Sequence, residues 1–227
     1  MTEPEWQSCA DPQKMLEFLN WRAPSAWGEV SDRKLRLFAV ACCRRVWHLA
    51  PHDDSRGAVE AAERFADGGG TAVDLRRVYL PAVQVFYDLR EGRPADREAA
   101  RAACSAAAES GWTAANLSGE WSLAAEVAGG GHAGPARADL LRDIFGNPFR
   151  PVSVSPSWRT PQVLALAQAA YEQRELPAGT LDLARLAVLA DALEDAGCDQ
   201  ADLLGHLRGP GPHVRGCWAV DLLLGQG

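Results

Sequence analysis

Apolar residues recur at three- and four-residue steps along most of the chain, which is the spacing of one buried face of an α-helix. The pattern is strongest over residues 33–49, R-K-L-R-L-F-A-V-A-C-C-R-R-V-W-H-L, which follow Ser31 and end before Pro51. One face of this segment carries Leu35, Phe38, Ala39, Cys42, Val46 and Leu49. Further apolar residues widen this face, so the pattern predicts a helix that is mostly buried.

Helix-starting and helix-ending residues divide the rest of the chain into further segments. Asp11–Pro12 and Thr160–Pro161 each have the pattern of an N-cap followed by proline at the first helical position. Thr71 followed by Asp74 predicts another helix start, and Pro81 is expected to kink or split that helix. No segment shows the period-two alternation of a strand. The sequence therefore predicts an all-α protein, a multi-helix bundle of about ten or eleven helices. The expected helices include 54–66, the Ala-rich segment 95–117, and 213–224.

Residues 140–161, L-L-R-D-I-F-G-N-P-F-R-P-V-S-V-S-P-S-W-R-T-P, interrupt the helical pattern with four prolines. Proline lacks an amide hydrogen and disfavours helical geometry at the residue before it, so no continuous helix is expected here. Phe145, Phe149 and Trp158 nevertheless place large apolar groups in this segment, and such groups usually bury. We therefore predict an ordered crossing segment that joins two helical parts.

This crossing segment defines the predicted domain division. Residues 1–139 are expected to form an N-terminal helical bundle with an Ala-rich variable part. Residues 140–161 are the Pro-rich crossing loop, and residues 162–227 form a C-terminal helical subdomain packed on the first part as one unit. For a protein partner, the backbone groups left unpaired by helix favour a surface in the crossing loop. The candidate partner-binding residues are Phe145, Asn147, Phe149, Arg150 and Trp158.

Charge and composition narrow the classes of partner. The net charge of the 227-residue chain is −7 and its pI is near 5.3. An acidic surface argues against nucleic acid and anionic membranes as partners. No apolar run reaches the roughly 20 residues that a membrane helix needs, and the N-terminus lacks the basic and apolar regions of a signal peptide. We therefore expect a cytoplasmic protein whose six cysteines are buried thiols rather than disulfides.

Three blocks of the sequence are distinctive. They are D-R-K-L-R-L-F-A-V-A-C-C-R-R-V-W-H-L at 32–49, L-L-R-D-I-F-G-N-P-F-R-P at 140–151, and residues 189–225, which contain L-A-D-A-L-E-D-A-G-C and G-P-G-P-H-V-R-G-C-W. These blocks resemble an uncharacterised group of paralogous helical proteins in GC-rich, planctomycete-type bacteria. Separately, residues 185–197 are similar to the planctomycete repeat-companion domain, which typically has Trp where this chain has Ala192. The resemblance implies no established activity, so no functional residue is carried over from it.

The strongest candidate for chemistry is a set of two cysteines and two histidines near the C-terminus. His213 and Cys217 are four residues apart at the predicted start of a helix, so both would face one side and chelate one ion. Cys198 and His206 flank the preceding short helix, and the G-P-G-P turn at 209–212 would fold them back. Zinc is the ion that such a site would hold. The favoured interpretation is instead a pair of buried cysteines, one capping histidine and one exposed histidine, with no cofactor.

A second set near residue 48 carries groups that a cysteine nucleophile or another metal site would use. Its members are Cys42, Cys43, His48, His52, Asp53 and Asp54. A nucleophile needs a base within hydrogen-bond reach and an oxyanion donor nearby. Cys42 instead lies on the apolar face, where a thiol is normally an inert small hydrophobe. No catalytic residue is therefore assigned.

The strongest predicted helix also carries a basic set, and glycine runs mark two turns. Arg33, Arg36, Arg44 and Arg45 would contact phosphates or an acidic partner, or form the ion-paired edge of a buried helix. The chain contains 30 acidic residues that are available to pair with them. The glycine runs at 68–70 and 129–131 lack the Lys-Ser/Thr of a P-loop and follow no strand, so they predict turns.

Three function classes follow from these observations. The first is a non-enzymatic, cytoplasmic helical interaction or scaffold module of unknown partner. The second is a small metal-binding protein that uses Cys198, His206, His213 and Cys217. The third is an enzyme with an unrecognised site in the helical bundle, which would require a deep pocket lined by paired titratable groups.

Overall fold

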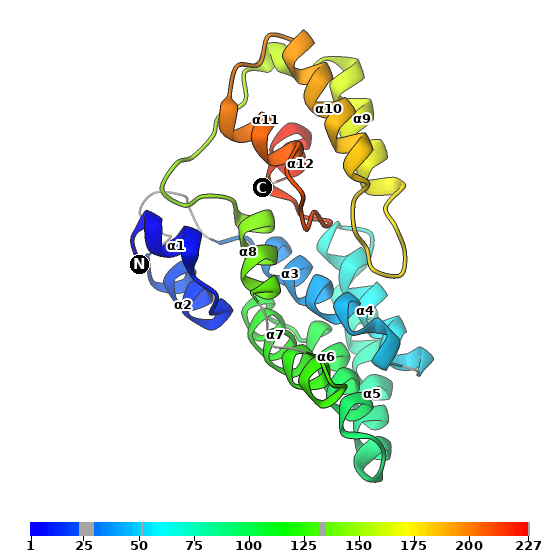
Figure 1. Cartoon of the computed structure of the whole chain (residues 1–227). Coiled ribbons are helices and arrows are strands. Elements are labelled where there is room, and N and C mark those ends of the chain that lie inside the picture. Colours follow the sequence, from blue (N-terminus) through cyan, green and yellow to red (C-terminus); the bar gives the residue numbers. More distant parts are fainter. Residues whose placement is uncertain (23–29, 51, 132–134, 227) are drawn as a thin grey trace. The chain divides into compact units, whose positions relative to one another are not determined.

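The structure, a computed structural model, describes residues 1–22, 30–50, 52–131 and 135–226. Over these ranges it has twelve α-helices and no strand, and it is 70% helical, which confirms the all-α prediction (Figure 1). No helix in these ranges has both the length and the apolar character that crossing a bilayer requires. Contacts divide the chain into two compact units, which are described separately below. The α2–α7 unit is 10–137, and the α8–α12 unit combines 1–9 with 138–227.

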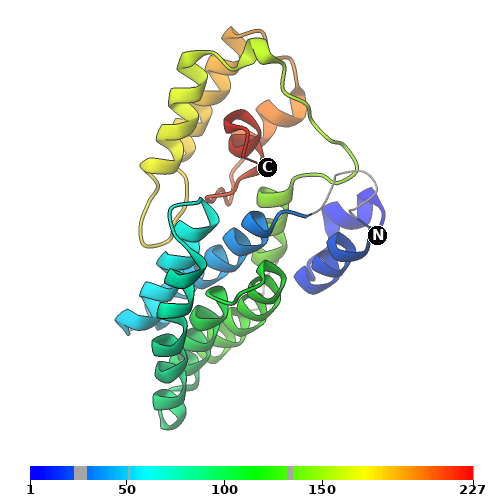
Figure 2. The same cartoon turned by 180° about the vertical axis from the view of Figure 1, so that it is seen from behind.

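The α2–α7 unit is a bundle centred on α3, the helix with the strongest sequence pattern. Helix α3 packs against α4, α6 and α7 (Figure 2). The Ser31 hydroxyl accepts the amide of Lys34 and starts the helix, and ten of the fourteen residues of α3 are buried. The prediction of a mostly buried helix is confirmed. The helices of this unit are α2 (Pro12–Arg22), α3 (Asp32–Arg45), η2 (Trp47–Leu49), α4 (Asp53–Ala66), α5 (Ala72–Asp88), η3 (Leu89–Glu91), α6 (Pro94–Ala106) and α7 (Gly111–Ala128).

The Ala-rich segment 95–117 is not one helix, as the sequence predicts, but two. Helix α6 ends at Ala106 and α7 begins at Gly111. The Ser110 side chain is the N-cap of α7, and the Gly111 amide donates to Oδ1 of Asp32 at 2.5 Å. Alanine propensity favours helix at every position, but it does not determine where a helix ends. Contacts from α3 determine it here.

Helix α5 is continuous through Pro81, so the proline does not split it. Pro81 is exposed, and the missing amide hydrogen faces a solvated part of the helix. The predicted start of this helix is confirmed. The Thr71 hydroxyl accepts the amide of Asp74, and a carboxylate oxygen of Asp74 accepts the Thr71 amide, which forms a capping box.

The α8–α12 unit is built on an apolar core between its C-terminal helices. Helix α9 packs on α10 and α12, and α11 packs on α10 and α12. The buried leucines of α10, α11 and α12 are at most 8% exposed in this core, and Tyr171 of α9 is 1% exposed. The helices of this unit are α1 (Glu3–Ser8), α8 (Ala136–Phe145, from residue 138), η4 (Pro156–Trp158), α9 (Pro161–Glu172), α10 (Leu183–Asp195), α11 (Ala201–Leu207) and α12 (Trp218–Leu224).

The two units differ from the predicted division into 1–139, 140–161 and 162–227. The Pro-rich crossing lies wholly within the α8–α12 unit, and the first helix belongs to this unit as well. Trp6 of α1 is fully buried, and its indole N–H donates to the carbonyl of Gly146 at 3.1 Å. The Arg142 guanidinium donates to the carbonyls of Trp6 and Cys9. These long-range bonds join the N-terminal helix to the end of α8.

The predicted partner-binding residues of the crossing are largely engaged within the unit. Phe145 and Trp158 are buried as expected, but Phe149 is 37% exposed, contrary to the expectation that it buries. The physical reason is a turn at Asn147, whose side-chain oxygen accepts the Phe149 amide at 3.0 Å and keeps this part at the surface. Both Asn147 and Arg150 bind Oε1 of Glu3, at 2.8 and 2.7 Å. Partner binding here stays a prediction.

Candidate metal centre

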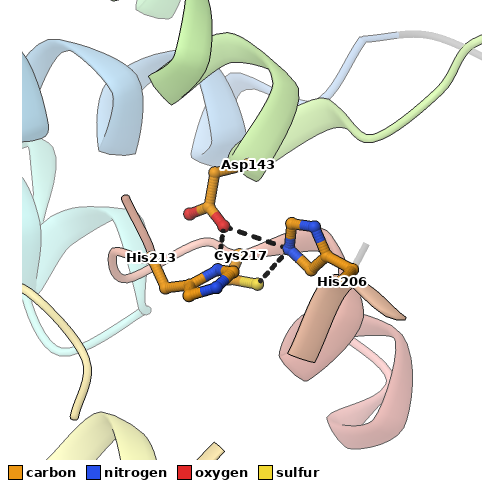
Figure 3. A group of neighbouring side chains, drawn as sticks. All are labelled: Asp143, His206, His213 and Cys217. Carbon is orange, nitrogen blue, oxygen red and sulfur yellow. Dashed lines mark hydrogen bonds and ion pairs between the residues drawn. The ribbon is translucent and has the colours of Figure 1, made fainter. Parts of the chain in front are cut away.

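Four side chains that can ligate a metal ion converge inside the α8–α12 unit (Figure 3). Asp143 comes from α8, His206 from the last turn of α11, His213 from the segment after α11, and Cys217 from the N-cap of α12. One potential ligand atom of each residue lies within 4.8 Å of those of the other three. Within the described ranges no other group of three or more such side chains meets in this way.

The Asp143 carboxylate is the hub of the group. Its Oδ1 lies 2.8 Å from Nδ1 of His213 and 3.1 Å from Nε2 of His206 (Figure 3). The same Nε2 of His206 lies 3.2 Å from the Cys217 sulfur. The second carboxylate oxygen accepts the backbone amide of Val214 at 2.9 Å, which fixes the orientation of the carboxylate. Oδ1 of Asp143 and Nε2 of His206 therefore take part in all three of the contacts that link the four side chains.

The group is almost completely removed from solvent. Asp143, His213 and Cys217 are 1%, 3% and 0% exposed, whereas 20% of the His206 side chain is exposed. A buried carboxylate is costly unless it is paired or coordinated. The partial exposure of His206 makes it the ligand closest to solvent.

Neighbouring aromatic rings hold the His206 imidazole. Its centroid lies 4.7 Å from the His213 ring, in an edge-on arrangement, and 5.0 Å from the Trp218 ring. Trp218 in turn packs over Gly146, where a Cβ atom would come within 3.0 Å of the indole. Gly146 also has φ = 69°, a left-handed conformation that favours glycine. Glycine at this position therefore permits the approach of Trp218 behind the candidate ligand.

His213 and Cys217 meet across a turn and not along a helix face. The predicted helix 213–224 begins only at Trp218. Gly216 has φ = 93°, which no helix accommodates, and the His213 carbonyl accepts the amide of Leu181 at 2.8 Å. The Cys217 amide donates to the Val214 carbonyl at 3.0 Å and closes the turn. The four-residue spacing thus brings the two side chains together by a different local structure.

A buried tyrosine supports the turn that carries Cys217. The Tyr171 hydroxyl lies 2.7 Å from Oδ1 of Asp221 and accepts the Gly216 amide at 3.2 Å. It also lies 3.3 Å from the Cys217 carbonyl. Tyr171 and Asp221 are each 1% exposed. These contacts fix the backbone before and after Cys217 and so hold its side chain in place.

Electrostatics within the group oppose the effects of burial. Burial alone would raise the pKa of Asp143, but hydrogen bonds and charge from the two histidines together lower it. Burial would lower the pKa of His213, and the Asp143 carboxylate reverses that effect and raises it. Burial, with the nearby Asp143 charge, raises the pKa of Cys217 well above that of an ordinary thiol. Without a metal ion, the protein therefore holds a thiol beside an ionised carboxylate.

These shifts predict how the stability of the metal-free protein depends on pH. The lowered pKa of Asp143 gives stability that is present above the unfolded-state value of about 3.9 and is lost as pH falls through the folded value. The raised pKa of His213 gives stability that is present below about 6.5 and is lost as pH rises through the folded value, and Cys217 acts in the same direction. When metal has been removed with a chelator, the free energy of unfolding measured in urea should be highest between about pH 4 and 6.5. Asp143→Asn should flatten this profile, and an unchanged profile would contradict the assignment.

Three of the four sequence-predicted metal ligands are brought together, and the fourth is not among them. Cys198 is buried in the apolar core with leucines of α10 and α11 and is not in the group. Asp143, which the spacing of residues did not predict, is the fourth member of the group. Its position in the sequence nevertheless pointed to an interaction partner. Asp143 lies in a helix turn between the buried Leu140 and Ile144, where an unpaired carboxylate would be costly.

The second candidate set, near residue 48, is not brought together as a catalytic site. Cys42 is fully buried, and burial raises its pKa to about 12, which makes the thiol a poor nucleophile at neutral pH. Burial likewise raises the pKa of Cys43. His52 instead caps α4, where its Nδ1 accepts the Asp54 amide at 3.4 Å.

The four arginines of the basic set contact groups of the α2–α7 unit. Arg33 pairs with a carboxylate at 3.0 Å, Arg44 at 2.6 Å and Arg45 at 2.9 Å, their partners being Asp67, Glu63 and Glu126. Arg36 is fully buried and binds backbone carbonyls. This arrangement is the ion-paired edge of a buried helix that the sequence analysis gives as one of its alternatives.

The geometry of the group favours coordination over nucleophilic catalysis. A Cys-His-Asp triad needs the two imidazole nitrogens to face different partners, whereas Nε2 of His206 faces both the Cys217 sulfur and Asp143. The Cys217 sulfur is also inaccessible. Comparison with family models, curated proteins and solved structures gives no match for this chain. The resemblance to planctomycete-type paralogues therefore stays a prediction.

Proposed function

We propose that the α8–α12 unit binds one divalent metal ion of the zinc class through Asp143, His206, His213 and Cys217. The observation that carries this proposal is the convergence of four ligand atoms within 4.8 Å, in a buried site assembled from three separate segments of the chain. Carboxylate oxygen, imidazole nitrogen and thiolate sulfur are the three ligand types that zinc uses in proteins.

The spacing of the four atoms suits a small tetrahedral ion. Around zinc, neighbouring ligand atoms lie about 3.3 to 3.6 Å apart, as its bond lengths require. Three pairs of ligand atoms, at 2.8, 3.1 and 3.2 Å, are closer than this, and all pairs lie within 4.8 Å, so small rotations of the side chains would accommodate the ion. Binding would also replace the proton on the Cys217 thiol with a cation, which removes the mismatch between a neutral thiol and an ionised carboxylate.

Four protein ligands favour a structural role over a hydrolytic one. A hydrolytic zinc site keeps one position open for water, whereas four side chains complete a tetrahedral shell. The ligands come from α8, α11 and the segment leading to α12, so one ion would tie together elements distant in sequence. We therefore favour a non-enzymatic metalloprotein. Its cytoplasmic location and its role as an interaction module stay predictions.

Metal analysis of paired cysteine variants tests the proposal. Protein purified without chelator, or reconstituted with zinc, is expected to hold one zinc per chain by elemental analysis. Cys217→Ser should lower zinc affinity by about tenfold or more, whereas the buried Cys198→Ser should retain full stoichiometry. Cobalt substitution should give a sulfur-to-cobalt absorption band in the parent and in Cys198→Ser, and the band should be absent in Cys217→Ser.

The same experiment separates metal binding from a purely hydrogen-bonded group. Folded protein that takes up no zinc or cobalt at stoichiometric concentration would overturn the proposal. Equal metal affinity for Cys217→Ser and Cys198→Ser would overturn the assignment of Cys217. Circular dichroism on each variant establishes that the compared proteins are folded.

A further inference from the structure

Helix α5 presents a row of large apolar side chains to solvent. Val73, Leu80 and Tyr87 are 59%, 70% and 59% exposed. They are separated by seven residues each, so they lie on one line along the helix. The opposite side of α5 carries the buried Leu75 and Val85, which pack into the α2–α7 unit. The outer row therefore has no role in the core of this unit.

The row is symmetric about the centre of the helix. Leu80 is the middle residue of α5, which runs from Ala72 to Asp88, and Val73 and Tyr87 are equidistant from it. A row with this symmetry is complementary to itself when two helices run antiparallel about a two-fold axis. Leu80 then faces Leu80 of the second copy, and Val73 faces Tyr87. In a parallel pairing Tyr87 would face Tyr87 of the second copy, and Val73 would face Val73.

The charges beside the row favour the same arrangement. Arg77 and Asp88 are both exposed and lie on the same flank of the apolar row, Arg77 toward the N-terminal half and Asp88 at the C-terminal end. In the antiparallel pairing this flank of one helix meets the same flank of the other. Arg77 then lies about 7.5 Å along the helix axis from Asp88 of the second copy, and its long side chain points toward that residue. Parallel pairing would instead bring opposite flanks together and place Arg77 beside Arg76 of the second copy, which repel each other.

We propose that α5 is a self-association surface, and that its partner is a second copy of this chain, paired antiparallel through Val73, Leu80 and Tyr87. This inference is independent of the metal site, because α5 belongs to the α2–α7 unit and no candidate ligand does. One pair of helices forms a small interface, below the roughly 1,200 Å² of stable complexes, so the dimer dissociates in the micromolar range.

Sedimentation equilibrium over a range of protein concentrations tests the pairing. The parent protein is expected to shift from monomer to dimer as concentration rises. Leu80→Glu should remain monomeric at the highest concentration, because it places two carboxylates against each other on the two-fold axis. Val188→Glu is the matched control, since Val188 is 51% exposed on α10, and it should dimerise like the parent. Both substituted residues are exposed, so thermal unfolding should be unchanged.

Charge reversal tests the antiparallel geometry. Arg77→Glu and Asp88→Arg should each weaken the dimer about tenfold, because two symmetry-related pairs change from attraction to repulsion. The double variant R77E/D88R restores opposite charges and should recover most of the parent affinity. A parent protein that stays monomeric at several hundred micromolar overturns the proposal. So does a Leu80→Glu variant that dimerises like the parent, or a double variant weaker than either single one.

Discussion

Removal of zinc by a chelator is expected to lower the melting temperature of the α8–α12 unit by about 15 to 30 °C. A ligand present at a thousand times its dissociation constant stabilises the folded state by about 4 kcal/mol. For a unit of fewer than about 100 residues, each kcal/mol corresponds to about 4 to 8 °C. The effect should be large because the ion would join Asp143 of α8 to ligands more than sixty residues away.

Hydrogen exchange measured by mass spectrometry assigns the effect to one unit. Peptides from α8, α11 and α12 should lose protection when zinc is removed, while peptides from α3 and α7 should not change. Asp143→Ala should reproduce the loss, and chelator should have no further effect on that variant. If zinc removal deprotects both units equally, or neither, the ion does not stabilise the α8–α12 unit as we propose.

The candidate site illustrates what spacing along a sequence predicts and what it does not. His206, His213 and Cys217 lie close enough in sequence for a turn to bring them together, and the turn-forming residues around 209–212 indicated this. Asp143 is separated from them by more than sixty residues, and only tertiary packing brings it to the group. Cys198 was near in sequence, but its side chain contributes to the core. Proximity along the chain therefore included one residue, Cys198, that the group of neighbouring side chains does not contain.

The fold shows the same limit at helix ends. Caps that depend on adjacent residues, such as Ser31 and the Thr71–Asp74 pair, were predicted from the sequence. The end of α6 was not, because a side chain of α3 provides its cap. Likewise, the place of Trp6 in the α8–α12 unit depends on a hydrogen bond to Gly146, 140 residues away. Local patterns predict which segments are helical, and long-range polar contacts determine where they end and what they join.

Arg36 is the residue on which the junction between α6 and α7 depends. Its side chain is fully buried, and Nη1 donates to the carbonyls of Ala106 at 3.2 Å and Ala108 at 2.7 Å. Its Nη2 donates to the Glu109 carbonyl at 3.0 Å and to Oδ2 of Asp32 at 3.2 Å. The last carbonyls of a helix have no partner within the helix, so a buried helix end requires donors from elsewhere. One guanidinium supplies them here.

Arg36→Ala is therefore expected to destabilise the α2–α7 unit by about 3 to 5 kcal/mol, because it leaves buried carbonyls without donors and opens a cavity. Arg33→Ala is the matched control on the same helix. Arg33 pairs with Asp67 at a partly exposed position, and its loss should cost only about 1 kcal/mol. Urea unfolding followed by circular dichroism measures both. Equal losses for the two variants would show that Arg36 contributes only an ordinary ion pair, whereas a large difference is the result expected if the Arg36 guanidinium satisfies the carbonyls at the buried junction of α6 and α7.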